Sequence, residues 1–130
     1  MKEKMIKVLK VEPGKLPKVV EIRNEPTALQ EAVSEGADYR GLIEIVSLDN
    51  KTCLLLNEEG KLIGLQPNRR LGQDIICGVF YVVGQNKNGD LCSLNDAAMA
   101  KYAQHFMVPE TFTDGEVAET IITRFFCYGG

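Results

Sequence analysis

Apolar and polar residues alternate along the first part of the chain, as in strands with one exposed face. The pattern predicts a strand at Met5–Val11 and a second strand at Lys18–Arg23. Between them, Pro13 and Gly14 suit the second and third positions of a type II turn. The first two strands are therefore predicted to pair as a hairpin.

After the second predicted strand, apolar residues recur at the spacing of a helix. Thr27 to Gln30 matches the capping-box pattern, after which Leu29 and Val33 fall on one helical face, and Gly36 is a natural stop. These residues predict a first, short helix.

The middle of the chain returns to strand patterns separated by turn residues. The predicted strands are Leu42–Leu48, Thr52–Leu56, the short Lys61–Leu65, and Ile75–Val83. The last is nine residues without a charge, rich in β-branched and aromatic side chains, which suits a strand covered on both faces. It is placed near the sheet centre.

After a polar loop at 84–90, Ser93 and Asp96 form another capping-box pattern, and apolar residues up to Phe106 recur at helical spacing. This predicts a second helix that covers the sheet.

The tail is ambiguous. Val117, Ile121 and Phe125 suit a helix, whereas Thr120–Phe126 suits a strand, which composition slightly favours. Phe125, Phe126 and Tyr128 must be buried in the chain's own core or against another copy, which predicts a homo-oligomer.

Together these elements predict an α+β fold: a mostly antiparallel sheet of about five to seven strands packed with two helices. Residues 1–108 would form the domain. Residues 109–130 would form a C-terminal extension that packs on it or on another subunit.

Composition agrees with a folded domain, because 45% of the 130 residues are hydrophobic and 25% are charged. Fifteen Lys and Arg against 18 Asp and Glu give a net charge of -3, which disfavours both nucleic-acid binding and DNA mimicry. No apolar run approaches the roughly 18 residues of a membrane span, and the start lacks a signal-peptide core. We therefore expect a cytoplasmic protein with neither nucleic acid nor membrane as a partner.

The four cysteines are Cys53, Cys77, Cys92 and Cys127. They form no C-x-x-C pair, and the chain has one histidine, so the sequence predicts reduced structural thiols and no metal site.

One polar stretch, Gln66–Asp74, concentrates groups that bind anions. Arg69 and Arg70 can bind phosphate or carboxylate, and the amides of Asn68 and Gln73 can bind a sugar or a base edge. These four residues are the predicted ligand-binding site.

The structural alternative for this stretch is local. In that interpretation Asn68 caps the turn, both arginines pair with carboxylates such as Asp74 or Glu58, and Gly72 allows the bend.

Catalysis has little support. His105 lies near the end of the second predicted helix, where a favourable charge at the helix C-terminus explains it better than a general base does. The adjacent Glu58 and Glu59 are predicted to form a solvated turn. No nucleotide-binding, hydrolase or metalloprotease motif is present, so no enzymatic activity and no cofactor are predicted.

The segments E-P-G-K, N-E-E-G-K-L-I-G-L, P-N-R-R and D-I-I-C-G-V-F resemble an uncharacterised family of small proteins carried by phages and conjugative elements of Gram-positive bacteria. The resemblance covers Met5 to Phe106. It transfers no catalytic or binding residue, but it implies an accessory role in a mobile element's conflict with its host.

The leading hypothesis is a non-catalytic protein that sequesters a small anionic, nucleotide-like ligand and so counteracts host defence signalling. The first alternative is a protein-protein inhibitor or adaptor that blocks a host enzyme. The second is an enzyme acting on a nucleotide, with Asn68, Arg69, Asp74 and His105 converging in space.

Overall fold

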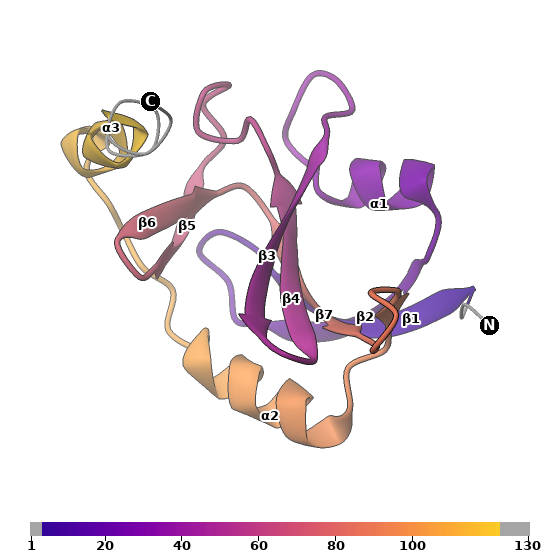
Figure 1. The fold of residues 1–130 in the computed structure, drawn as a ribbon. Helices are drawn as coiled ribbons and strands as arrows, with labels where there is room; N and C mark the ends of the chain where they lie inside the picture. Colours follow the sequence, from indigo (N-terminus) through magenta and orange to yellow (C-terminus); the bar gives the residue numbers. More distant parts are fainter. Residues whose placement is uncertain (1–3, 123–130) are drawn as a thin grey trace.

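The computed structural model describes residues 4–122 and contains a six-stranded antiparallel sheet with a helix on either face (Figure 1). The strands are β1 (Met5–Val11), β2 (Lys18–Arg23), β3 (Ile43–Asp49), β4 (Thr52–Asn57), β5 (Pro67–Leu71), β6 (Asp74–Cys77), β7 (Phe80–Gln85) and β8 (Leu91–Cys92). The helices are α1 (Pro26–Ala32), α2 (Asp96–His105) and α3 (Asp114–Ile122). The predicted α+β class is confirmed, with one helix more than expected.

The main sheet has the strand order β2-β1-β7-β4-β3, and β8 pairs with β7. Strands β5 and β6 form a separate two-stranded sheet beside it. The hairpin β1–β2 is confirmed: Gly14 has a φ of 73°, and the Lys15 N–H donates to the Glu12 carbonyl at 3.2 Å, as a type II turn requires.

Two apolar clusters cover the two faces of the main sheet. On one face α2 contributes Tyr102, and Phe106 follows at its end; on the other face Leu29 of α1 packs together with Val33. Side chains of β7 alternate between the clusters, with Phe80 and Val82 in the first and Tyr81 and Val83 in the second. The central position that the sequence predicted for this segment is confirmed for β7.

The predicted strand Ile75–Val83 is nevertheless wrong as one element. Gly78 has a φ of 91° and divides it into β6 and β7, which belong to different sheets. A Cβ atom at Gly78 would lie 2.8 Å from Leu65 Cδ1, so both the backbone conformation and the packing favour glycine there.

The predictions for residues 61–64 and for Gln66–Asp74 are also wrong, because the positions of the turns differ from those that the sequence indicated. Residues 61–64 form a turn rather than a strand, and most of the polar stretch Gln66–Asp74, which contains no predicted strand, belongs to the hairpin β5–β6. Leu71 pairs with Asp74 across a two-residue turn, and Gly72 has the positive φ of 61° that such turns use.

Both predicted helix caps are displaced. Helix α1 begins at Pro26, whose missing N–H suits a first helical position, so Thr27 is already inside the helix. Helix α2 is capped by Asn95, whose Oδ1 accepts from the Ala98 N–H at 2.8 Å. Ser93 Oγ instead accepts from the Lys7 N–H of β1.

For the tail, where the sequence suits either a helix or a strand and composition slightly favours the strand, Asp114–Ile122 is a helix. Thr113 and Glu116 form a reciprocal cap: each backbone N–H donates to the other's side chain, at 2.9 and 3.1 Å. Val117, together with Phe112, packs against a third apolar cluster that contains Cys77. The residues predicted to be buried in the tail, Phe125, Phe126 and Tyr128, lie outside the described residues, as does Cys127.

Candidate functional site

The four residues predicted to bind a ligand separate into two pairs. Asn68 and Arg69 are buried, at 0% and 1% exposure, whereas Arg70 and Gln73 are exposed at the hairpin β5–β6. Alternation along β5 explains the difference between the arginines, because successive side chains point to opposite faces of a strand.

Asn68 connects β5 to the main sheet. Its Nδ2 donates to the carbonyls of Val11 and Gly78, each at 2.9 Å, and its Oδ1 accepts from Arg69 Nη1 at 2.8 Å. The side chain thus satisfies backbone groups at the end of β1 and at the bend between β6 and β7. The structural alternative predicted that Asn68 caps a local turn, whereas the side chain joins three separate segments of the chain.

Arg69 donates mainly to backbone carbonyls. Nε donates to Phe106 at 3.1 Å, Nη2 to Lys15 at 2.6 Å, and Nη1 to Asn68 at 3.2 Å. Burial lowers the pKa of this guanidinium, against a smaller opposing effect of Glu110. Arg69 therefore fastens the end of α2 and the β1–β2 turn to β5, and its donors face the interior.

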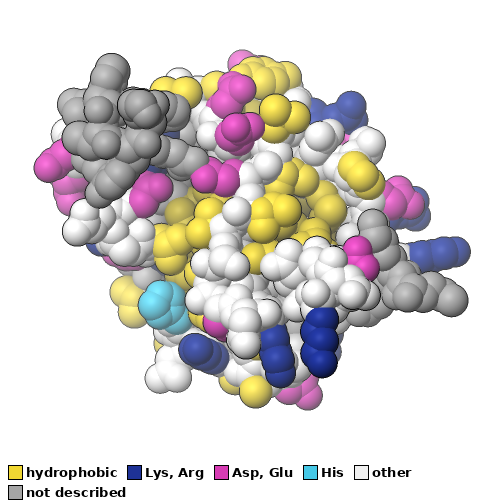
Figure 2. Space-filling view, in the orientation of Figure 1, with side chains coloured by type: hydrophobic (Ala, Val, Ile, Leu, Met, Phe, Trp, Pro, Cys, Tyr) yellow, Lys and Arg dark blue, Asp and Glu magenta, His cyan; other side chains and the backbone are white. Residues whose placement is uncertain are grey.

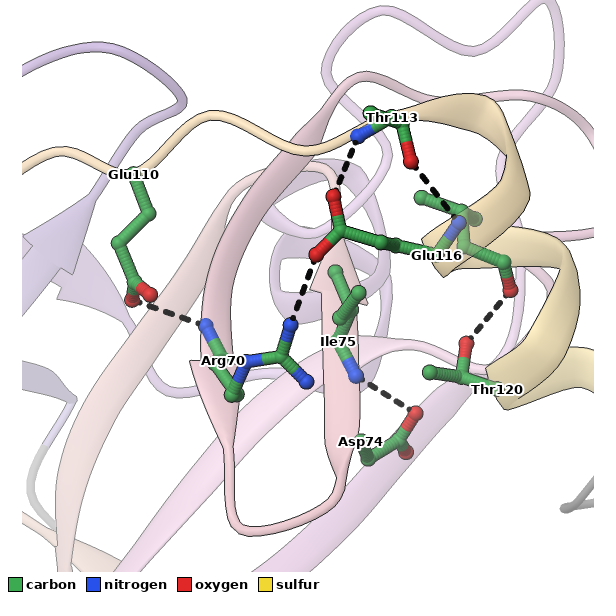
Figure 3. A network of polar contacts seen from close by, with 8 residues as sticks. Arg70, Asp74, Ile75, Glu110, Thr113, Glu116 and Thr120 are labelled. Atoms are coloured by element: carbon green, nitrogen blue, oxygen red, sulfur yellow. Dashed lines mark hydrogen bonds and ion pairs between the residues drawn. The ribbon is translucent and has the colours of Figure 1, made fainter.

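Arg70 joins the hairpin to the C-terminal helix (Figure 3). Its Nη2 lies 3.2 Å from Glu116 Oε2, its backbone N–H donates to Glu110 Oε2, and its guanidinium lies 5.4 Å from the centre of the Phe112 ring. Hydrogen bonds from the backbone and side chain of Thr113, and then the charge of Arg70, lower the pKa of Glu116. The structural alternative is thus correct in that Arg70 pairs with a carboxylate, although the partner is Glu116 and not Asp74 or Glu58. It is wrong for Arg69, whose guanidinium donates to carbonyl oxygens.

Arg70 and Gln73 line an open depression of about 360 Å³, which we call the hairpin depression. Its other lining residues within 4–122 are Gly72, Glu116, Glu119 and Thr120. Among the described lining residues, two carboxylates accompany one guanidinium, and the carboxylate of Glu116 already pairs with that guanidinium. An anion at this place would have to displace Glu116.

A second depression, of about 340 Å³, lies where the β3–β4 turn, the loop after β7 and the start of α2 meet. We call it the lysine depression. Its polar lining includes Asn50, Lys51, Asn86, Lys87, Ser93 and Asn95, and none of the described lining residues is a carboxylate. Figure 2 shows Lys and Arg side chains along the lower edge of this face, where the β3–β4 turn lies in Figure 1.

The local chemistry of the lysine depression suits an anion. Asn95 caps α2, so the positive end of the helix dipole faces this region, although Asp96 in the first turn offsets part of it. Side-chain amides can add hydrogen bonds to a sugar or base. This site has no local signal in the sequence, because its residues come from the β3–β4 turn, the loop after β7 and the start of α2.

The remaining candidates behave as structural groups. His105 lies in the last turn of α2 and is exposed, with its ring edge-on to Phe106. Cys53 and Cys77 are buried, as predicted, and burial raises the pKa of Cys53 to about 11. Within residues 4–122 there is no group of three potential metal ligands, and no helix there is long and apolar enough to cross a membrane.

The fold and the two depressions describe a small α+β domain with two polar surface hollows. A domain of unknown function, DUF3846, matches residues 6–107, so the chain belongs to that family. The match ends just after α2 and leaves α3 outside it. No curated protein and no solved structure matches the chain.

Proposed function

We propose that this protein is a non-catalytic accessory protein of a phage or other mobile element. In this proposal it binds and sequesters a small anionic, nucleotide-like ligand and thereby counteracts host defence signalling. The observation that carries the proposal is the lysine depression, where Lys51 and Lys87 accompany asparagine amides without a carboxylate among the described lining residues. Its volume, about 340 Å³, lies within the range of small-ligand sites.

In this proposal the lysines and the asparagines recognise different parts of the ligand. The two lysines would bind phosphate oxygens as point charges, and the asparagines would accept from or donate to the sugar and base. Both lysines lie in turns at the sheet's end, so neither is needed for the core. This makes them suitable for substitution without loss of the fold.

The test is calorimetric titration with a panel of nucleoside monophosphates, cyclic dinucleotides and inorganic phosphate. Combining Lys51→Glu with Lys87→Glu should weaken binding by about 100-fold, because two charge-assisted contacts become repulsive. Arg70→Glu, in the hairpin depression, is the matched control and should leave the affinity unchanged.

Three results would count against this proposal. Absence of binding across the panel contradicts it outright. Loss of binding in Arg70→Glu alone would move the ligand to the hairpin depression that the sequence predicted. Chemical conversion of a bound nucleotide would establish the enzymatic alternative.

A second candidate function, a protein-protein inhibitor or adaptor, is favoured by apolar side chains just after α2. Met107 and Val108 are 50% and 72% exposed. If this surface binds a host enzyme, Val108→Lys should abolish recovery of one dominant partner in cross-linking pull-downs, whereas Lys87→Glu should not. Equal recovery with both variants would contradict this surface.

A further inference from the structure

The two edges of the main sheet differ in how they are protected against pairing with another strand. The β2 edge carries Lys18, Glu21 and Arg23, spread along its length. The β3 edge contains no lysine, arginine or proline, and its charges are Glu44 and Asp49. Charges, lysine in particular, and proline are the features that keep natural edge strands apart, so β3 is the less protected edge.

Strand β3 also exposes apolar side chains. Ile45 is 54% exposed, and Leu42, just before the strand, is 59% exposed. Residues Ile43–Ser47 pair with β4 in regular register, which then shifts between Ser47 and Asp49. Ile45 is the middle residue of this regular segment, so the open edge is symmetric about it.

We propose that two copies of this chain pair antiparallel through β3, about a two-fold axis at Ile45, so that one sheet continues across both subunits. In this register Ile43 lies opposite the partner's Ser47, and Glu44 lies opposite the partner's Val46. No like charges face each other, and the two Ile45 side chains become neighbours. A two-fold contact uses the same surface on both copies and closes on itself, which limits the assembly to a dimer.

Charges at the two ends of β3 favour a second copy as the occupant. The N-terminal end lies beside Glu58, whose N–H donates to the Leu42 carbonyl, and near Glu59, which accepts from Tyr39. The C-terminal end carries Asp49, whose carboxylate accepts from Tyr102 and from the Lys51 N–H, and it leads into the exposed Lys51. Antiparallel pairing brings Lys51 of each copy towards the end where the partner's Glu58 and the partner's Glu59 lie.

Sedimentation of the wild-type protein and two edge variants tests this dimer. Ile45→Lys would place two ammonium groups side by side and should raise the dimer dissociation constant about tenfold or more. Val19→Lys, at a residue 49% exposed on the β2 edge, should leave it unchanged. Circular dichroism verifies that both variants remain folded. A wild-type monomer at concentrations on the order of 100 µM would overturn the dimer, as would a larger effect of Val19→Lys.

Oxidative cross-linking tests the register. With copper phenanthroline as oxidant, Ile45→Cys should give a covalent dimer, whereas Val19→Cys and the wild-type protein should not. A non-covalent dimer that Ile45→Cys fails to cross-link would overturn the pairing about Ile45. Lys87→Glu should weaken ligand binding and leave the dimer intact, so the dimer and the proposed ligand site fail separately.

Discussion

Arg69 is a buried cation whose hydrogen bonds end on carbonyl oxygens, with no ion pair to a carboxylate among the described residues. Such a group is costly to bury, but removing it leaves its acceptors unsatisfied. The carbonyl of Phe106 is one of these acceptors and lies at the C-terminal end of α2, where a positive charge is favourable. Arg69 thus contributes to stability through the groups it satisfies.

We predict that Arg69→Met lowers the free energy of unfolding by about 3 kcal/mol, because several buried carbonyl groups lose their donors. Urea denaturation measures the change. Arg70→Met is the control, since its partner Glu116 is exposed, and it should cost less than about 1 kcal/mol. Equal losses in the two variants would show that Arg69 has no special structural role.

A second prediction concerns pH. Tyr102 Oη donates to Asp49 Oδ2 at 2.6 Å, and the Lys51 N–H donates to Oδ1 at 2.8 Å. These hydrogen bonds, that of Tyr102 first, lower the pKa of Asp49, so the stabilisation is present above the unfolded pKa of about 3.9. It is lost as the pH falls through the lower folded pKa, when the carboxylate is protonated.

Tyr102→Phe should therefore raise the pKa of Asp49 towards its ordinary value and cost about 1 kcal/mol at neutral pH. The loss should shrink in acid, because the wild-type carboxylate is then protonated as well. Titration of the Asp49 side chain by NMR, with urea denaturation at each pH, measures both effects. A constant difference between the two proteins from pH 7 to pH 2 would contradict this assignment.

At the scale of elements, the alternation of apolar and polar residues was enough to predict regular strands of the main sheet. Strand β1 and the hairpin β1–β2 were predicted correctly, since local alternation and the turn at Pro13-Gly14 agree. The run from Ile75 to Val83 could not be divided by the same reasoning. Its hydrophobicity is continuous across Gly78, and only the bend there assigns its halves to different sheets.

The candidate site was less predictable than the fold. Arg69 and Arg70 are adjacent and chemically identical, yet strand alternation buries one and exposes the other, and that required β5 to be recognised as a strand. The helix α3 did have a local signal, the capping pair Thr113 and Glu116, which was outweighed by the β-branched residues that follow. The lysine depression had none, because it forms only where the β3–β4 turn, the loop after β7 and the start of α2 meet.

Gly78 gives the third prediction. Gly78→Ala should destabilise the protein by about 2 kcal/mol or more, because alanine would strain a φ of 91° and press on Leu65. Gly89→Ala is matched in backbone conformation, with a φ of 84°, but its Cβ would have no atom within 4 Å. It should cost only about 1 kcal/mol. Thermal unfolding of both variants separates strain from packing, and similar losses would contradict the contact with Leu65.

At the scale of the whole molecule, β7 is the element on which the rest depends. It is paired on both sides, with β1 and with β4, and its side chains enter the apolar clusters on both faces. Exposing β7 to solvent therefore requires the apolar clusters on both faces of the sheet to come apart. The hairpin β5–β6, by contrast, pairs only with itself and lies at the periphery of the main sheet (Figure 1).

The fourth prediction follows from this arrangement. Amides of β7 should exchange with solvent only through global unfolding, whereas those of β5 and β6 should also exchange through local opening and be less protected. Native-state hydrogen exchange at increasing urea concentrations measures this. Equal protection of the hairpin and β7 would mean that the molecule opens as one unit.

The bonds of Arg69 also bear on the order of folding. The hairpin β1–β2 joins residues close in the sequence, whereas Arg69 reaches Lys15 and Phe106 across 54 and 37 positions. Contacts that close long loops tend to form after local ones. If the guanidinium is captured after the rate-limiting step, Arg69→Met accelerates unfolding several-fold and leaves the folding rate nearly unchanged. A chevron plot measures both rates. If unfolding is the rate that changes, the hydrogen bonds of Arg69 determine the lifetime of the folded state.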